Sequence, residues 1–312
     1  MQSYYPIVLT AFVGSLTSVF SQVTSETYVE RKSQEYLTNQ ARKEAVAGTQ
    51  VDQADTSGKM VLEEKPFRRW TVVPSYSHTF FNKGREDWQR ATLDMFYQPR
   101  KDLLLGGSVD YLSRPPNDDD VVYSLNASWY PLKKLEVHGE VSYTPDANFM
   151  PNNKYTAGFQ YIINSQFTAL LDVDQLYFDL KNSDEDYDLT QIKPGVVWWF
   201  TEESNVTLRY AYGWVHNEVD YDYYSAALNY GELPRDGQLT LGFAYGTDPE
   251  LDLGAPGALL SDAYIGTLFY REPIKPNLSV FAGVEYVYRL RPNSDEELYQ
   301  SITPTIGLVW KF

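Results

Sequence analysis

Cysteine is absent from this chain of 312 residues, and histidine occurs only three times. Without cysteine the chain can form neither a disulfide framework nor a thiolate metal site. The three histidines, His78, His138 and His216, lie far apart and lack the spacing of a metal-ligand set. The sequence therefore predicts no metal site and no bound cofactor.

Long apolar runs and basic residues are also scarce. No uninterrupted apolar stretch reaches about 18 residues, so a membrane-spanning helix is not predicted. Lysine and arginine total 26 against 42 aspartates and glutamates, giving a net charge of -16. This balance argues against a nucleic-acid partner, which needs clustered basic residues. A phosphate-binding glycine loop, a Gly-x-Ser-x-Gly elbow and a His-Glu-x-x-His zinc motif are all missing.

What the chain does have is aromatic residues, with 26 tyrosines and 7 tryptophans, and strict alternation of apolar and polar side chains. Residues 298–312 show it most clearly, because successive side chains of a strand point to opposite faces. One face of this segment is small and mostly polar. The other is apolar and ends in two aromatics, which suits a membrane interface; it carries Ile302, Pro304, Ile306, Leu308, Trp310 and Phe312. We interpret the segment as the closing strand of a transmembrane barrel.

Similar segments recur from about residue 67 onward, each near the length of a tilted spanning strand. An even strand number is typical of bacterial outer-membrane barrels. We therefore predict an all-β fold, a transmembrane antiparallel up-and-down β-barrel of about 14 strands over residues 67–312. A soluble β-sandwich is the alternative that so much tyrosine also allows. The predicted strands are residues 70–81, 88–98, 103–112, 121–130, 135–143, 155–163, 167–178, 190–200, 205–215, 221–230, 238–246, 263–270, 278–289 and 298–312.

The connections between these segments alternate in kind. Short ones are residues 99–102, 131–134, 164–166, 201–204, 231–237 and 272–276. Longer or more acidic ones are residues 113–120, 144–154, 179–188, 216–220, 247–262 and 291–297, and the brief first connection, 82–87, falls in this second set. Because outer-membrane barrels have short periplasmic turns and longer outer loops, we expect both chain ends in the periplasm and the protein in the bacterial outer membrane.

The N-terminal part differs in composition from the rest. Residues 1–21 are predicted to be a signal peptide with an apolar core at residues 7–16. Its first residues carry no lysine or arginine, and a buried strand or helix remains an alternative. Residues 22–66 are predicted to be a helical and flexible extension, with Ser33 capping a helix that ends before Gly48. This extension could lie in the periplasm or plug the barrel mouth, and a solvated extension without a role of its own is the expectation that we favour.

Charge decides which face of each strand points inward. An arginine or lysine on the lipid face at mid-membrane costs about 2–4 kcal/mol, so the charged face must line the lumen. Two interpretations of this lining stay open, an ion-pair network that braces the wall or a lining that selects a solute. Residues 263–270 are ambiguous and receive no face assignment. Together with Arg90, the predicted lumen-lining residues are Asp94, Asp110, Glu136, His138, Glu140, Asp172, Asp174, Lys193, Arg209, Glu285 and Arg289.

The lipid-facing aromatics Trp129, Trp198, Trp310 and Phe312 are expected to form a membrane girdle against lipid and lipopolysaccharide. The C-terminal strand is expected to engage the barrel-assembly machinery. The acidic segments 118–120, 184–188 and 295–297 are expected to form a solvated outer rim, with weak divalent-cation binding as the alternative. Residues 184–195 fail the calcium-loop pattern, which requires Gly and Glu where Leu189 and Gly195 stand.

Three stretches carry a resemblance to a known family: Gly-Gln-Leu-Thr-Leu-Gly-Phe-Ala-Tyr-Gly at 237–246, Leu-Ser-Val-Phe-Ala-Gly-Val-Glu-Tyr at 278–286 and Ile-Gly-Leu-Val-Trp-Lys-Phe at 306–312. The barrel resembles the YaiO family of outer-membrane β-barrel proteins, which is similar to the barrel portion of the poly-N-acetylglucosamine exporter porin. The resemblance implies an outer-membrane address and a link to surface polysaccharide. It supplies no catalytic motif, and the tetratricopeptide repeats of that exporter are missing here.

Three functional hypotheses follow. The first is a pore or conduit for a polysaccharide or a small polar solute, in which aromatics such as Trp199 and Phe281 stack on the passing chain. The second is a closed structural or surface-interaction barrel whose acidic outer loops do the work. The third is a membrane-embedded hydrolase or transferase that uses His138, flanked by Glu136 and Glu140, as acid or base.

Overall fold

The computed structural model describes residues 70–100, 102–115, 119–179, 187–201, 203–215, 219–234, 237–250, 259–291 and 296–312. The signal peptide predicted at residues 1–21 and the extension predicted at residues 22–66 lie outside them. No helix in the described part of the chain is long and apolar enough to cross a membrane.

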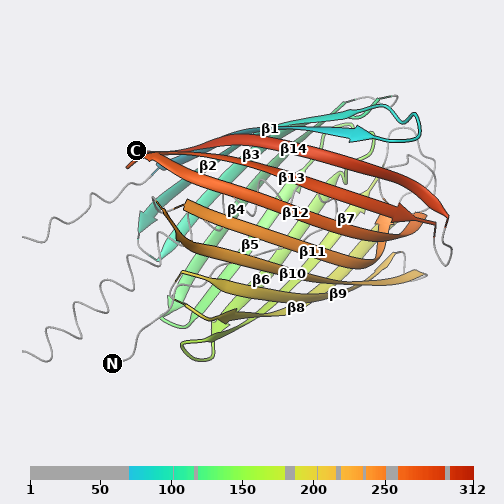
Figure 1. Cartoon of the computed structure of the whole chain (residues 1–312). Coiled ribbons are helices and arrows are strands. Elements are labelled where there is room, and N and C mark those ends of the chain that lie inside the picture. The colour runs from blue at the N-terminus through green and yellow to red at the C-terminus, as the bar shows by residue number, and fades with distance from the viewer. Residues whose placement is uncertain are drawn as a thin grey trace, which may run out of the picture.

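Fourteen antiparallel strands close into one barrel, each paired with its neighbours in chain order and β1 paired with β14 (Figure 1). This confirms the predicted all-β up-and-down barrel. The strands are β1 (Trp70–Phe81), β2 (Trp88–Arg100), β3 (Leu103–Ser113), β4 (Asp120–Leu132), β5 (Leu135–Tyr143), β6 (Asn153–Ile162), β7 (Phe167–Phe178), β8 (Tyr187–Trp199), β9 (Asn205–Val215), β10 (Val219–Leu233), β11 (Gly237–Glu250), β12 (Leu259–Lys275), β13 (Leu278–Leu290) and β14 (Glu297–Lys311).

The ladder between β1 and β14 closes the barrel. Its register runs from Thr71 opposite Lys311 to Phe81 opposite Ser301. At its end, the Trp70 amide donates to the Phe312 carbonyl and the Phe312 amide to the Trp70 carbonyl, both at 3.0 Å. The two ends of the described chain therefore lie side by side at the end of the barrel that carries the short turns. Closure leaves the described sheet without an edge that could pair with another chain.

The predicted strands match the observed ones, and the largest correction concerns β11 and β12. The predicted connections 247–262 and 272–276 are too long, because β11 continues to Glu250 and β12 spans Leu259–Lys275. Both strands continue through a proline: Pro249 pairs with Leu260 in the ladder, and Pro273 lies at a register shift, a position where a strand tolerates proline.

The alternation along each strand separates an apolar outer face from a more polar inner one. On β14, the outward Ile302, Ile306 and Leu308 are exposed, while the intervening Thr303 and Thr305 are buried. On β12, whose faces the sequence left undecided, Tyr264 and Leu268 point outward, and Ala263, Ile265, Phe269 and Arg271 are buried inside. A wall that exposes a continuous apolar band requires an apolar surrounding.

Aromatic side chains mark both ends of this outer band. Trp129, Trp198, Trp310 and Phe312 are all exposed on the outer face. The first three lie opposite the first residues of β3, β7 and β13, and so beside the short turns. At the opposite end the exposed aromatics are mostly tyrosines, among them Tyr111, Tyr123, Tyr143, Tyr155 and Tyr177. The girdle role of the tryptophans stays a prediction.

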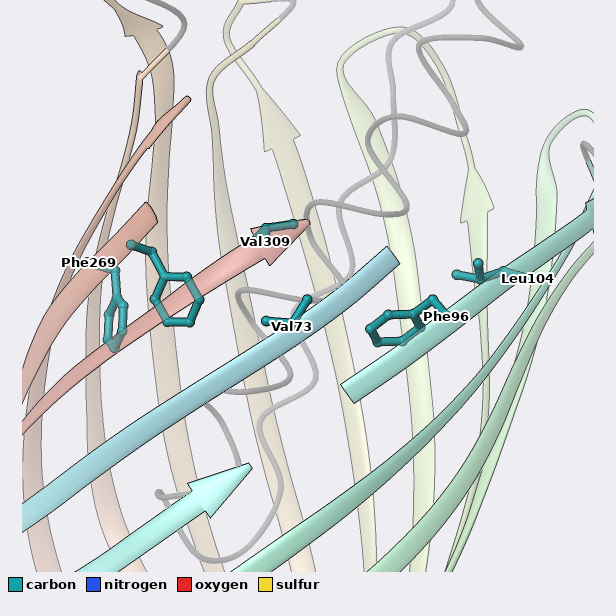
Figure 2. Packing of buried hydrophobic residues seen from close by; sticks show 6 residues of the cluster. Val73, Phe96, Leu104, Phe269 and Val309 are labelled. Atoms are coloured by element: carbon teal, nitrogen blue, oxygen red, sulfur yellow. The ribbon is translucent and has the colours of Figure 1, made fainter. Parts of the chain in front are cut away.

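An apolar cluster follows the inner wall across β12, β13, β14, β1, β2 and β3 (Figure 2). Two of its rings lie against glycines of the next strand, since Phe281 pairs with Gly307 and Phe269 with Gly283. A Cβ on Gly307 would lie 2.2 Å from Phe281 Cζ, and one on Gly283 would lie 2.4 Å from the Phe269 ring. The glycines let these rings lie flat along the wall. The cluster contains Val73, Phe96, Leu104, Phe269, Phe281 and Val309.

This packing predicts the effect of adding one methyl group. In Gly307→Ala the new Cβ would meet Phe281 and, at 2.8 Å, the Pro74 carbonyl oxygen. We expect the free energy of unfolding, measured by denaturant titration in lipid vesicles, to fall by about 1–3 kcal/mol. The control is Gly266→Ala, whose Cβ would meet nothing within 4 Å and should change stability by less than about 0.5 kcal/mol. Equal losses in the two variants would contradict this account of the inner wall.

Candidate functional site

The inner face of the barrel carries the charged residues. The structure places all the predicted lumen-lining residues there, most of them buried, with the His138 and Glu140 side chains 9% and 11% exposed. They fall into separate groups rather than one ring. The largest group lies on β5 to β9 and is centred on Asp172; we call it the Asp172 cluster, and it comprises Glu136, His138, Thr156, Gln160, Asp172, Asp174, Lys193 and Arg209.

Asp172 on β7 binds partners from two strands that are not its neighbours in the sheet. His138 Nε2, from β5, lies 2.8 Å from Asp172 Oδ1. Arg209 Nη1, from β9, donates to Asp172 Oδ2. Each partner reaches over one intervening strand, β6 on one side and β8 on the other. One carboxylate therefore ties together a sheet segment five strands wide.

Glycines on the intervening strands make this reach possible. Gly158 on β6 lies in register between His138 and Asp172. A Cβ on Gly158 would lie 2.1 Å from Asp172 Oδ1 and 2.4 Å from His138 Nε2. Gly195 on β8 pairs with Arg209, and a Cβ there would lie 2.7 Å from Arg209 Cγ. Any larger residue at either glycine would occupy the space that the bridging side chains need.

The remaining members of the Asp172 cluster surround this bridge. Lys193 Nζ lies 2.5 Å from Asp174 Oδ2, and Thr156 Oγ1 donates to Asp174 Oδ1 at 2.8 Å. Gln160 Nε2 donates to Glu136 Oε2 at 3.0 Å. Lys193 and Asp174 thus form a close buried pair of opposite sign, which offsets part of the cost of desolvating the two charges.

His138 has a carboxylate beside each ring nitrogen. Nε2 faces Asp172, and Nδ1 lies 3.9 Å from Glu136 Oε1. A general base needs a ring nitrogen directed at the proton that it removes. Nε2 is bonded to Asp172, and Nδ1 lies near Glu136 but beyond hydrogen-bond distance, so the geometry favours a bridging role for His138.

A second charged group lies on β2 and β3. Arg90 donates to Asp110 Oδ1 from Nε at 2.9 Å and from Nη2 at 2.6 Å. Asp94, on the same face of β2, is buried, and its Oδ2 has no hydrogen-bond partner in the described part of the chain. Close by, Lys154 Nζ donates to Glu140 Oε1 at 2.8 Å. This wall therefore combines two ion pairs, Arg90–Asp110 and Lys154–Glu140, with the buried carboxylate of Asp94.

The third group lies on β12 and β13. Glu285 is 2% exposed, and its Oε2 lacks a hydrogen-bond partner in the ranges that the structure describes. Arg289, on the same strand face, donates to Ser261 Oγ at 2.7 Å. Arg271 donates to Ser279 Oγ at 3.0 Å. Both arginines of this group therefore bind hydroxyl groups of neighbouring strands.

Of the acidic residues expected in a solvated outer rim, Asp119 is exposed and Asp120 is buried. Asp120 is not a solvated loop residue, because it begins β4 and is 1% exposed. Asp119 is exposed and accepts a hydrogen bond from the Tyr111 hydroxyl, which holds the pKa of this carboxyl below its usual value. Asp118 and residues 184–186 and 295 lie outside the described residues. Within the described ranges, no three of the histidine and acidic side chains group closely enough to hold a metal ion.

Sequence reasoning found the charged inner face but missed what joins it. Gly158 and Gly195 carry no charge. Only their position in the middle of predicted strands could have indicated that a side chain from another strand passes close to the backbone there. Gln160 and Thr156 were missed because neutral polar residues suit either face. The burial of Asp120 has no local signal, since its partners lie in a different connection.

Comparisons with known proteins give the fold but no family. No family model matches the chain, and no curated protein matches it. A bacterial polysaccharide outer membrane secretin is similar over 80% of this chain and 100% of its own, with a TM-score of 0.55 and 9% identity. The monoaromatic hydrocarbon channel CymD is similar over 78% of this chain and 89% of its own, with a TM-score of 0.54 and 9% identity. A mutant of TodX, another monoaromatic hydrocarbon channel, covers 80% and 91% with a TM-score of 0.54 and 11% identity. At this identity the likeness shows the barrel fold alone.

The contacts of the Asp172 cluster predict that the free energy of unfolding depends strongly on the Asp172 carboxylate. Asp172→Asn would leave the buried Arg209 guanidinium without its counter-charge, and we expect a loss of about 3–5 kcal/mol in the free energy of unfolding. The matched control is Glu296→Gln, which breaks an ion pair of 3.0 Å between Arg291 and Glu296 whose side chains are both 58% exposed. That variant should lose less than about 1 kcal/mol. If Asp172→Asn is no more destabilised than the control, the cluster does not brace the wall.

Proposed function

We propose that this protein is a bacterial outer-membrane barrel whose lumen conducts a small polar solute or a polysaccharide chain. One observation carries the proposal: the inner face of the closed barrel carries charged side chains of both signs. They include Arg90, Asp94, Arg209 and Glu285. Charged side chains that line a pore select the solutes that pass through it.

The distribution of groups around the lumen supports a solute with both hydroxyl groups and apolar surface. The Asp172 cluster occupies β5 to β9, and the apolar cluster with Phe269 and Phe281 occupies β12 to β3. In the strand order of the barrel, these two walls are half a circumference apart. Sugar hydroxyls can both donate to carboxylates and accept from guanidinium groups, and the apolar face of a sugar ring can pack against an aromatic ring. A glycan therefore suits this pair of walls.

The structural neighbours support a conduit without deciding its cargo. One neighbour is named for polysaccharide secretion, and two are named as channels for monoaromatic hydrocarbons. The polar inner wall favours the first kind of cargo over the second. The resemblance of residues 237–246, 278–286 and 306–312 to the YaiO family, with its implied link to surface polysaccharide, agrees with that preference.

The outer face supports the proposed location and partners. Its apolar band would contact membrane lipid, and the exposed Trp129, Trp198, Trp310 and Phe312 at one end would lie at the lipid interface. The tyrosine-rich opposite end would then meet lipopolysaccharide. We propose that β14, with its exposed terminal aromatics, is the strand that the assembly machinery engages.

A closed structural or surface-interaction barrel is the second candidate. The observation that favours it is the dense packing inside, where residues such as Glu136, Asp174 and Lys193 are 0–1% exposed. The two candidates differ in one measurable property, the ion current through the lumen.

The conduit predicts a selective ion current in planar lipid bilayers. Glu140→Gln removes an inward negative charge, on a side chain that is 11% exposed, and should shift the reversal potential in a salt gradient toward anion preference. Arg289→Gln removes an inward positive charge and should shift it in the opposite direction.

The control for both is Trp310→Phe on the outer face, which should leave the selectivity unchanged. Absence of any current from correctly folded wild-type protein would contradict the conduit and favour the closed barrel. Shifts of the same sign in the two charge variants would contradict the proposed lining.

A further inference from the structure

The connection between β5 and β6, residues 144–152, turns into the barrel instead of projecting from it. Thr144 and Ala147 are 0% exposed, Phe149 is 1% and Asn148 is 8%. Outer loops normally expose polar residues to water, so a loop buried to this degree must be held by specific contacts. Its ends meet in a hydrogen bond from the Thr144 amide to the Asn152 carbonyl, at 2.9 Å.

The carboxylate of Asp120 provides the contacts on one side. Its Oδ1 accepts from the Asn148 amide at 2.8 Å and from Asn148 Nδ2 at 3.0 Å. Its Oδ2 accepts from the amides of Phe149 at 3.0 Å and Met150 at 2.8 Å. Three successive backbone amides are thus satisfied by one buried anion at the start of β4. Charge-assisted bonds of this kind are stronger than neutral ones.

A ring contact strengthens the same attachment. Phe149 packs with Leu112 of β3 and Val122 of β4. The Arg114 guanidinium carbon lies 4.5 Å from the centroid of the Phe149 ring and 4.4 Å from that of Trp88, between the two rings. This geometry gives a cation–π interaction with both. The attachment therefore ties the loop to β2, β3 and β4.

The other side of the loop packs against the far strands. Ala147 belongs to a buried cluster with residues from β7, β8, β9 and β10. A loop that joins β5 to β6 is thus linked to β2 through Arg114 and to β10 through this cluster. It must extend inward from the wall near the long-loop end of the barrel in order to do so. The members of this cluster are Ala147, Leu176, Phe178, Leu189, Val215 and Tyr221.

We propose that residues 144–152 form the constriction at the long-loop mouth of the lumen, and that Asp120 is the positioning residue that keeps them folded inward. The inference rests on the proposed conduit, since a constriction then sets the size of the solute that passes. Asp120 itself would touch no solute, because its oxygens are occupied by the loop.

The first test measures the loop position without any current. Because the natural chain has no cysteine, Ala147→Cys introduces one thiol at a position that is 0% exposed. Labelling by a membrane-impermeant maleimide should be slow in folded Ala147→Cys protein. Adding Asp120→Ala should raise the labelling rate by at least about tenfold, since the loop loses its charged acceptor.

The matched control is Asp119→Ala in the same Ala147→Cys protein. This neighbouring carboxylate is exposed and accepts from the Tyr111 hydroxyl, so its loss should leave the labelling rate unchanged. Equal labelling rates in the Asp120 and Asp119 variants would overturn the positioning role of Asp120.

The second test compares conductance in planar bilayers. Asp120→Ala should raise the single-channel conductance and admit larger polyethylene glycols than the wild type. A variant with residues 145–151 replaced by Gly-Gly should do the same with Asp120 intact, which covers the case in which Asp120→Ala does not fold.

The outcomes separate this inference from the proposed function. If the wild type conducts and neither variant differs from it, the constriction is refuted and the conduit stands. If the wild type is silent and the variants conduct, the loop is an occluding element of a closed barrel, which supports the constriction and contradicts the open conduit. In the last case, Asp120→Ala raises the labelling rate of the thiol at position 147, but neither the wild type nor any variant conducts. The positioning role of Asp120 then stands, and the constriction is refuted together with the conduit.

Discussion

Closure of the backbone ladder is the constraint on which the rest of this structure depends. A sheet that presents apolar side chains to its surroundings cannot leave a row of amide and carbonyl groups unpaired there, because no water is present to bind them. The pairing of β1 with β14 removes that row, down to the reciprocal bonds between Trp70 and Phe312. Once the sheet is closed, the alternation along each strand becomes a division between the outside and the inside of a cylinder.

Because of that division, the polar side chains lie inside the barrel. Their placement makes one inner wall charged and the opposite one apolar. Asp172 gathers His138 and Arg209 over Gly158 and Gly195 on one side of the barrel. On the opposite side, rings such as Phe281 lie flat over glycines. On both walls a glycine lies beneath a long side chain. Because glycine has no side chain, the long side chain of the neighbouring strand can lie along the wall.

Much of this could be predicted from the sequence, because the strand period of two repeats over the whole barrel. The period fixed the strand number and the faces of β13 and β14, and the cost of a charge in lipid assigned Glu285 and Arg209 inward. Strand ends were less certain, since residues 247–262 and 272–276 were assigned to connections although the ladder continues through Pro249 and Pro273. The partner of each inward charge could not be predicted, because His138 and Asp172 are joined across a strand between them. The inward turn of residues 144–152 was missed for the same reason: its acceptor, Asp120, precedes it by a whole hairpin.

The central claim is that alternate positions of each strand face lipid and lumen, with the even positions of β13 facing lipid. The most direct measurement places single cysteines at successive positions 282–287 of β13, labels each with a small fluorophore, and records quenching by brominated lipids in vesicles. The account predicts strong quenching at positions 282, 284 and 286 and weak quenching at 283, 285 and 287. Uniform quenching along the strand, or none at the even positions, would contradict it.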